Sequence, residues 1–153
     1  MLQPIEIKLL KGFCSITFGE TMDSVKKIVG EPEEIQQLSD DVLHTASTVY
    51  HYWDLGYSLF FDNYKNNSFC SVELDNKAAV LFNVKIFALK EKEVIELLKT
   101  NGYKLTDNET HEWGEKRLSF DDAGLDCYFE NQKMVSVNFG SIEANQNLYY
   151  FPN

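Results

Sequence analysis

Apolar and polar residues alternate along two short segments, Cys70–Leu74 and Val135–Phe139. A period of two is typical of an antiparallel strand with one face in the core and one in water. An apolar segment that begins with glycine precedes each of them, Gly56–Asn63 in the first case and Gly124–Asn131 in the second. The pattern therefore predicts two β-hairpins, with a turn at the asparagine that ends each glycine-led segment.

The two hairpins belong to a longer internal repeat. Three residues recur unchanged at an offset of 68: Gly56, Phe61 and Asn63 match Gly124, Phe129 and Asn131. The offset falls to 65 in the strands that follow, where Val72 matches Val137. We therefore expect the second hairpin loop to be three residues shorter than the first.

Each half also has a helical pattern ahead of its hairpin. In the first half the apolar stripe is Val25, Ile28 and Val29, with Thr21 as N-cap and Gly30 and Pro32 at the end. In the second half the stripe is Val94, Leu97 and Leu98, and Gly102 ends the helix. A strand precedes each helix, over Phe13–Phe18 and Leu81–Phe87.

Together these elements predict an α+β fold. Each half reads as a strand, a helix and a meander of about three strands, so helices should pack on one face of a largely antiparallel sheet. The expected organisation is a single domain, 1–153, made of two tandem repeats at about 13–80 and 81–142. A short C-terminal tail, 143–153, follows them.

The charge of the chain is strongly negative. Twenty-four acidic residues stand against fourteen basic ones, the net charge is −10, and Arg117 is the single arginine. This charge repels phosphate backbones, so no nucleic-acid partner is expected. It favours a basic protein partner by steering association, although solubility alone is the alternative explanation.

The acidic residues gather near both tryptophans. Over 107–130, eight acids and two bases give a local charge of −6, and Trp113 lies within this segment, while Trp53 precedes Asp54 in the first half. Tryptophan among acids is typical of an interface anchor. Core packing is nevertheless the more common role for such rings, and a charge run is usually a solvated face. The predicted partner-binding residues are Trp53, Asp54, Glu112, Trp113, Glu115, Asp121 and Asp122.

Motifs for catalysis, metal binding or cofactor binding are absent from the sequence. Asp121-Asp122 has a metal or acid–base role as its alternative, but the following Ala123-Gly124 favours a turn. Cys127 as a nucleophile would need a base, and none is evident beside it in the sequence. We therefore expect no enzyme activity, no metal and no cofactor.

The expected location is the cytoplasm. Three separated cysteines, Cys14, Cys70 and Cys127, suit a reducing compartment. The N-terminal residues 1–8 lack the features of a signal peptide, and no apolar run approaches the length of a membrane span.

The first helix also carries a family resemblance. Its pattern, Gly19-x-Thr21-x-x-x-Val25-x-x-x-Val29-Gly30-x-Pro32, resembles that of small bacterial lipoproteins of the outer-membrane-assembly type. Tyr50–Tyr52 and Leu59–Asp62 continue this pattern. Two such units in tandem are similar to the β-lactamase-inhibitor-protein architecture, which presents a concave sheet to an enzyme. The chain departs from the lipoproteins in lacking a lipidation signal, and its second helix lacks the Gly-x-Pro ending.

Acidity, small size and the lack of catalytic motifs also resemble bacterial immunity proteins. The leading hypothesis is a non-enzymatic inhibitor, an immunity protein that neutralises a toxin or enzyme by direct occlusion. The alternative is an accessory binding module of a bacterial surface or assembly system. An exposed sheet edge would allow an edge-paired homodimer as well as a monomer.

Overall fold

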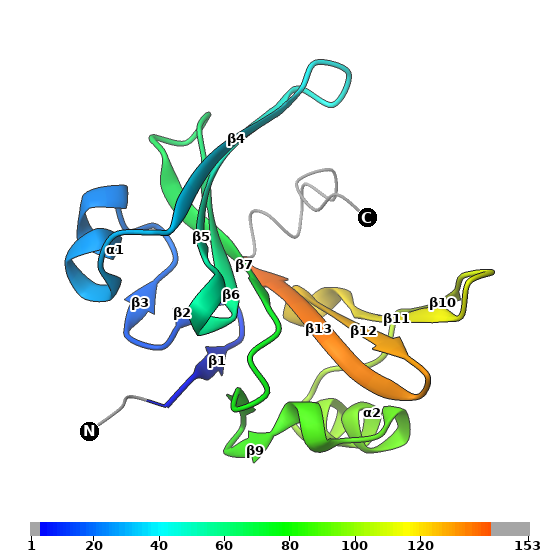
Figure 1. Cartoon of the computed structure of the whole chain (residues 1–153). Helices are drawn as coiled ribbons and strands as arrows, with labels where there is room; N and C mark the ends of the chain where they lie inside the picture. The colour runs from blue at the N-terminus through cyan, green and yellow to red at the C-terminus, as the bar shows by residue number, and fades with distance from the viewer. Residues whose placement is uncertain (1–3, 142–153) are drawn as a thin grey trace.

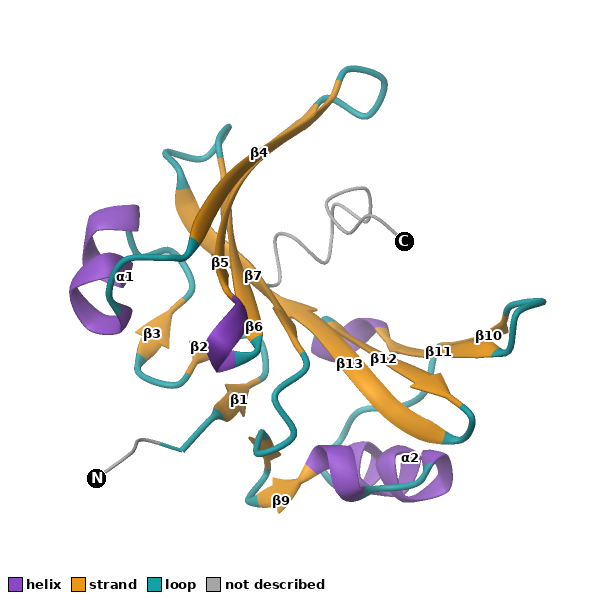
Figure 2. Ribbon diagram, in the orientation of Figure 1, coloured by secondary structure: helices purple, strands orange, loops and turns teal. Residues whose placement is uncertain are grey.

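A computed structural model describes residues 4–141 of the chain (Figure 1). These residues form a large sheet of eight strands, a small sheet of five short strands and two α-helices (Figure 2). Within the described part, every strand pair of the large sheet is antiparallel, and one parallel pair joins β1 to β8 in the small sheet. The chain is therefore an α+β protein with mostly antiparallel sheets, as predicted.

The large sheet has the strand order β10-β11-β12-β13-β7-β6-β5-β4, and the small sheet has the order β3-β2-β1-β8-β9. The strands of the large sheet are β4 (Glu34–Asp40), β5 (Thr45–Tyr52), β6 (Tyr57–Asp62), β7 (Ser68–Leu74), β10 (Asp107–Thr110), β11 (Glu115–Phe120), β12 (Leu125–Glu130) and β13 (Lys133–Gly140). Those of the small sheet are β1 (Glu6–Lys8), β2 (Gly12–Phe13), β3 (Ile16–Thr17), β8 (Val80–Leu81) and β9 (Val84–Lys85). The helices are α1 (Met22–Val29) and α2 (Glu91–Thr100), with short 3-10 helices η1 (Trp53–Leu55), η2 (Ile86–Ala88) and η3 (Asp121–Ala123).

The large sheet has the same order of elements on both sides of its centre. From the central pair β7 and β13, the neighbours outward are β6, β5 and β4 on one side and β12, β11 and β10 on the other (Figure 1). A 3-10 helix capped by a left-handed glycine precedes β6 and β12 alike, with Gly56 at φ 75° and Gly124 at φ 62°. The loop after β6 spans residues 63–67 and the loop after β12 only 131–132, which confirms the predicted difference of three residues.

The two helices begin and end where the sequence indicated. Thr21 Oγ1 accepts a hydrogen bond from the Ser24 N–H at 3.1 Å, which confirms the N-cap of α1, and Gly30 ends this helix at φ 105°. In α2 the chain turns away after Thr100, at Gly102 with φ 92°. One residue of the predicted apolar stripes, Ile28, does not face the core, because it is 46% exposed.

The strands predicted ahead of the helices are in fact tight hairpins. Residues 12–17 form β2 and β3 rather than one strand, and residues 80–85 form β8 and β9, followed by η2. Cys14 (φ 56°) and Phe82 (φ 52°) adopt the left-handed conformation inside these turns. Cys and Phe rarely adopt a positive φ and gave no turn signal. In the second hairpin the neighbouring Asn83 (φ 64°) is a residue type common in turns, so a signal was present there and was missed.

The meander of each half contains four strands rather than about three. The extra strands are the edges β4 and β10, whose residues are exposed except for a half-buried Leu38. Residues 31–41, which contain five acids and no base, are mostly β4. An edge strand that buries neither face has no apolar alternation, which is why the pattern of the sequence missed both strands.

One cluster of buried side chains joins the elements. It contains Val25 of α1, Val94 and Leu98 of α2, and apolar residues of both halves of the large sheet, such as Phe61 and Phe129. The predicted C-terminal tail, 143–153, lies outside the described residues.

Candidate protein-binding surface

A continuous row of polar residues crosses the large sheet, one from each strand. We name it the polar row; in cross-strand order it consists of Glu34, His51, Ser58, Glu73, Asn138, Asp126, Ser119 and Asp107. Four of its eight members are acidic and none is lysine or arginine. The row continues across the boundary between the two halves of the sheet, because Glu73 of β7 pairs with Asn138 of β13.

The polar row lies on the face of the sheet opposite the core. Six of its members are each adjacent in sequence to one residue of a second cross-strand row. This second row is apolar apart from one phenol and consists of Tyr50, Leu59, Val72, Phe139, Leu125 and Phe120. All six residues of this second row are at most 3% exposed. Because neighbouring residues of a strand point to opposite faces, the apolar row belongs to the core and the polar row to the outer face.

In the first half of the polar row, the His51 ring contacts three neighbouring side chains. Its Nδ1 lies 2.7 Å from Ser58 Oγ, and its Nε2 lies 2.8 Å from Gln36 Oε1. The amide oxygen of Gln36 is only an acceptor, so Nε2 carries the proton and, in the neutral ring, Nδ1 accepts from Ser58. The ring also stacks on Trp53, with centroids 5.0 Å apart and an interplanar angle of 13°. His51 is thus fixed by two hydrogen bonds and supports an exposed indole.

The second half of the polar row contains polar groups that lack partners. Among residues 4–141, two buried side-chain oxygen atoms form no hydrogen bond, Ser119 Oγ and Asn138 Oδ1. Both belong to strands that flank Asp126. Burial raises the pKa of the Asp126 carboxyl, while Ser119, close by but outside hydrogen-bond geometry, and Arg117 partly oppose this shift. Unpaired buried polar atoms cost about 1–3 kcal/mol each, so this region is a local source of instability in the sheet.

Arg117 neutralises the acids at the edge of the second half. Its Nη2 lies 3.1 Å from Asp107 Oδ2 and 2.8 Å from Glu109 Oε2, and its side chain is only 13% exposed. Glu109 Oε1 also lies 3.3 Å from His111 Nε2, and the His111 ring stacks on Trp113 at 4.5 Å between centroids, with an interplanar angle of 2°. The exposed Trp113 therefore has an aromatic support of the same kind as Trp53.

The seven predicted partner-binding residues fall into three separate places. Trp53 and Asp54 belong to η1, and Glu112, Trp113 and Glu115 lie at the tip of the β10–β11 hairpin. Asp121 and Asp122 begin η3, at the other end of β11. The six residues of β11 span about 20 Å, so the hairpin tip and η3 do not form one patch.

The structure answers the question of core packing for both tryptophans. Trp53 is 56% exposed and Trp113 is 73% exposed, so neither ring is part of the core and that alternative is wrong. Asp121-Asp122 does form a tight bend, although as a short 3-10 helix.

The sequence indicated the outward polar residues of single strands but missed the polar row. Glu73 and Asn138 stood out as polar positions of alternating strands. Their alignment with His51 and Asp126 depends on pairing between segments far apart in the chain, and no local pattern carries that information.

The cysteines are poor candidates for reactive thiols. Burial raises the pKa of Cys70 to about 12 and also raises the pKa of Cys127, so both thiols are protonated at neutral pH. Across residues 4–141 there is no group of three or more His, Cys, Asp or Glu residues able to hold a metal ion. Nor does this part of the chain contain a helix that is long and apolar enough to span a membrane.

Comparisons with known proteins add little to this geometry. No protein-family model matches the chain, and no curated protein matches it. A similar solved structure is that of YjgB from Bacillus subtilis, a protein of the DUF4309 family. The two chains share 16% identity over 80% of this chain and 78% of the other, with a TM-score of 0.44.

Proposed function

We propose that this chain is a non-enzymatic protein that binds a basic protein partner through the outer face of its large sheet. The observation that carries the proposal is the polar row, with four acids and with the exposed Trp53 ring stacked on its member His51. Acidic groups steer a basic partner and slow its dissociation when they become paired, while exposed aromatic rings supply anchoring area.

Electrostatics of Asp126 support the same partner chemistry. Burial opposes the charge of this carboxylate, and Arg117, which pairs with Asp107 and Glu109, offsets the burial only in part. A lysine or arginine of a partner beside Asp126 would favour the charged carboxylate and so lower its pKa. A basic partner would therefore stabilise a carboxylate whose charge is opposed by burial.

We infer that the two halves descend from one duplicated unit. Supporting observations are the matching order of strands about β7 and β13, the hairpins 12–17 and 80–85, and the glycine caps Gly56 and Gly124. The hairpins and the glycine caps recur 68 residues apart, and the matched strands occupy equivalent places in the sheet. Duplication would explain how a small unit came to present a binding face eight strands wide.

An immunity protein that occludes a toxin or enzyme in the cytoplasm is the specific form of this proposal. The charge of −10 suits a basic target, and the width of the sheet suits steric blocking of an active site. The second candidate remains an accessory binding module of a bacterial surface or assembly system, which would use the same face on a target that is not toxic.

The test begins with the purified protein as bait for a lysate of its native host, eluted by a salt step. The decisive comparison is between two charge reversals that change the net charge equally, Glu73→Lys in the polar row and Glu96→Lys on α2. Both residues are exposed, so both variants should keep the thermal midpoint of the parent. We expect Glu73→Lys and Trp53→Ala to lose a basic partner that Glu96→Lys retains.

The outcome also separates the two candidate functions. A partner that arrests growth when expressed alone, and not when co-expressed with this chain, supports the immunity protein. A partner without toxicity supports the accessory module. Equal retention of every captured protein by the parent and by Glu73→Lys would refute the polar row as the binding face, and a second pair, Glu112→Lys and Glu115→Lys, would then test the hairpin tip.

A further inference from the structure

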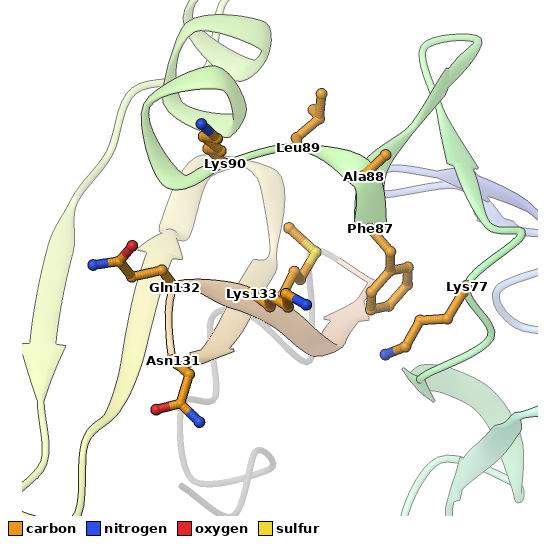
Figure 3. A pocket seen from close by; sticks show the side chains of 9 residues that line it. Lys77, Phe87, Ala88, Leu89, Lys90, Asn131, Gln132 and Lys133 are labelled. Carbon is orange, nitrogen blue, oxygen red and sulfur yellow. The ribbon is translucent and has the colours of Figure 1, made fainter.

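A pocket of about 620 Å³ lies away from the polar row, between the β7–β8 connection, η2 and the β12–β13 turn (Figure 3). This volume falls within the range of about 300–1,000 Å³ that is usual for small-molecule sites. Its lining comes from three segments that are distant in the chain: Lys77, then Phe87, Ala88, Leu89 and Lys90, then Asn131, Gln132, Lys133 and Met134. The pocket is therefore a product of the tertiary fold.

The lining carries three positive charges and no negative one. Lys77, Lys90 and Lys133 all belong to it, although acidic residues outnumber basic ones by 24 to 14 in the chain. None of the three ammonium groups forms an ion pair with any residue of 4–141. The lining itself is thus positive in a strongly acidic protein, with Glu130 directly opposite Lys133 in the β12–β13 pairing.

The nearest acids of α2 are engaged elsewhere. Glu91 Oε1 lies 2.6 Å from Lys116 Nζ, and Glu93 Oε1 accepts a hydrogen bond from the backbone N–H of Lys90 at 2.8 Å. The carboxylates closest in sequence to Lys90 therefore leave its side chain available to a ligand.

One lysine is held in place at the wall of the pocket. Lys77 Nζ donates to the Val135 carbonyl oxygen at 2.9 Å and lies 4.4 Å from the centroid of the Phe87 ring. An ammonium group has three donors, so two remain for a ligand. Figure 3 shows Lys77 and Lys133 near the Phe87 ring and Lys90 at the start of α2.

The rest of the lining is suited to an apolar group. Phe87 and Leu89 are half-buried and Met134 is 3% exposed, so together they offer ring, branched and thioether surface next to the ammonium groups. Asn131 and Gln132 add amide groups from a turn in which both residues have positive φ, at 51° and 68°. The same pocket thus combines an apolar wall with several hydrogen-bond donors.

We propose that this pocket binds a small organic anion with an apolar or aromatic body and an oxyanion head, either a phosphate or a carboxylate. The body contacts Phe87, Leu89 and Met134, and the head accepts charge-assisted hydrogen bonds from the lysines. This site is independent of the proposed protein-binding face, since the pocket lining includes no member of the polar row.

The test uses the full chain labelled with ¹³C at its methionine methyl groups. The chain has three methionines, Met1, Met22 and Met134, so Met134 reports on the pocket and Met22, in α1, serves as an internal reference. The probes are phenyl phosphate, benzoate, inorganic phosphate and phenol, titrated separately to about 10 mM, which detects dissociation constants in the millimolar range. We expect phenyl phosphate or benzoate to shift the Met134 signal in a saturable manner while the Met22 signal stays in place.

The probes and variants distinguish a built site from general attraction. Phenol and inorganic phosphate should each bind at least fivefold more weakly than the probe that joins ring and charge. Lys90→Gln and Lys133→Gln should weaken binding fivefold or more, whereas Lys99→Gln, at the other end of α2 and outside the pocket, should not. All three lysines are exposed, so the fold should tolerate these changes.

Several results would overturn the proposal. These are the absence of a Met134 shift with every probe, equal shifts of Met22 and Met134, binding of phenol as tight as that of phenyl phosphate, or equal weakening by Lys99→Gln. Preference for phenyl phosphate or for benzoate would support it and would identify the head group.

Discussion

Replacement of Trp113 by alanine is expected to destabilise the fold less than the loss of a buried aromatic ring. Trp113 is 73% exposed, so its neighbours cover about a quarter of its surface. With roughly 250 Å² for a tryptophan and about 25 cal/mol per Å² of apolar surface, the covered part contributes about 1.5 kcal/mol. That figure is an upper estimate because it assumes a fully extended unfolded chain. The stacked His111 ring adds about 0.5–1 kcal/mol, so we expect a loss of about 1.5–2.5 kcal/mol.

Phe120→Ala provides the matched comparison within the same hairpin. Phe120 ends β11 and is fully buried, so its truncation should lower the free energy of unfolding by about 3–5 kcal/mol. Urea unfolding followed by far-ultraviolet circular dichroism measures both variants, and unchanged m-values would show that the unfolding reaction is the same. Circular dichroism is the better probe because both tryptophans of the chain are already exposed in the folded state.

The fluorescence of the folded protein offers an independent check. With Trp53 and Trp113 both exposed, the native emission should resemble that of solvated indole and should be quenched readily by acrylamide. A loss of stability for Trp113→Ala as large as that for Phe120→Ala, or native emission protected from acrylamide, would refute the reasoning. The indole would then be a packing residue, and its role as a binding anchor would lose its basis.

Three further predictions follow from single contacts. Gly12→Ala should lower the thermal midpoint strongly, because a Cβ at Gly12 would collide with the carbonyl oxygen of Ile16 inside the β2–β3 hairpin; an unchanged midpoint would contradict this. Asp126→Asn should raise the free energy of unfolding at pH 7 more than at pH 4. Burial raises the folded-state pKa of Asp126. The stability that this carboxyl contributes is therefore present below its unfolded pKa and is lost as the pH rises through the folded pKa. Urea titrations at the two pH values measure the difference, and a variant less stable at pH 7 would reverse the sign. Cys70, with a pKa of about 12, and the buried Cys127 should resist iodoacetamide at pH 8 in the folded protein and react in urea, as mass spectrometry would show.

Much of the local structure was readable from short-range patterns. Thr21 and Gly30 mark the ends of α1 because a cap and a helix stop act on neighbouring backbone groups. The period-two pattern indicated β7 and β13, and the change of offset from 68 to 65 indicated the shorter second hairpin loop. In each case the chemistry that forms the element lies within a few residues of it.

Elements without a local signal were missed or misread. The edge strands β4 and β10 are held by backbone pairing with β5 and β11 while their side chains face solvent, so hydrophobic periodicity does not mark them. The β2–β3 hairpin turns at Cys14, a residue type without preference for positive φ. Here backbone pairing and tertiary packing override the weak preferences of single residues.

The sequence by itself determined the α+β class, the places of both helices and the outward direction of polar residues such as Glu73 and Asn138. These properties follow from periodicity and capping, which are local. Only the tertiary structure placed Glu73 and Asn138 in one row with Asp126, left Trp53 exposed, and brought Lys77 beside Phe87. Strand register and pocket geometry depend on contacts between residues far apart in the chain, and such contacts are decided by how the whole core packs.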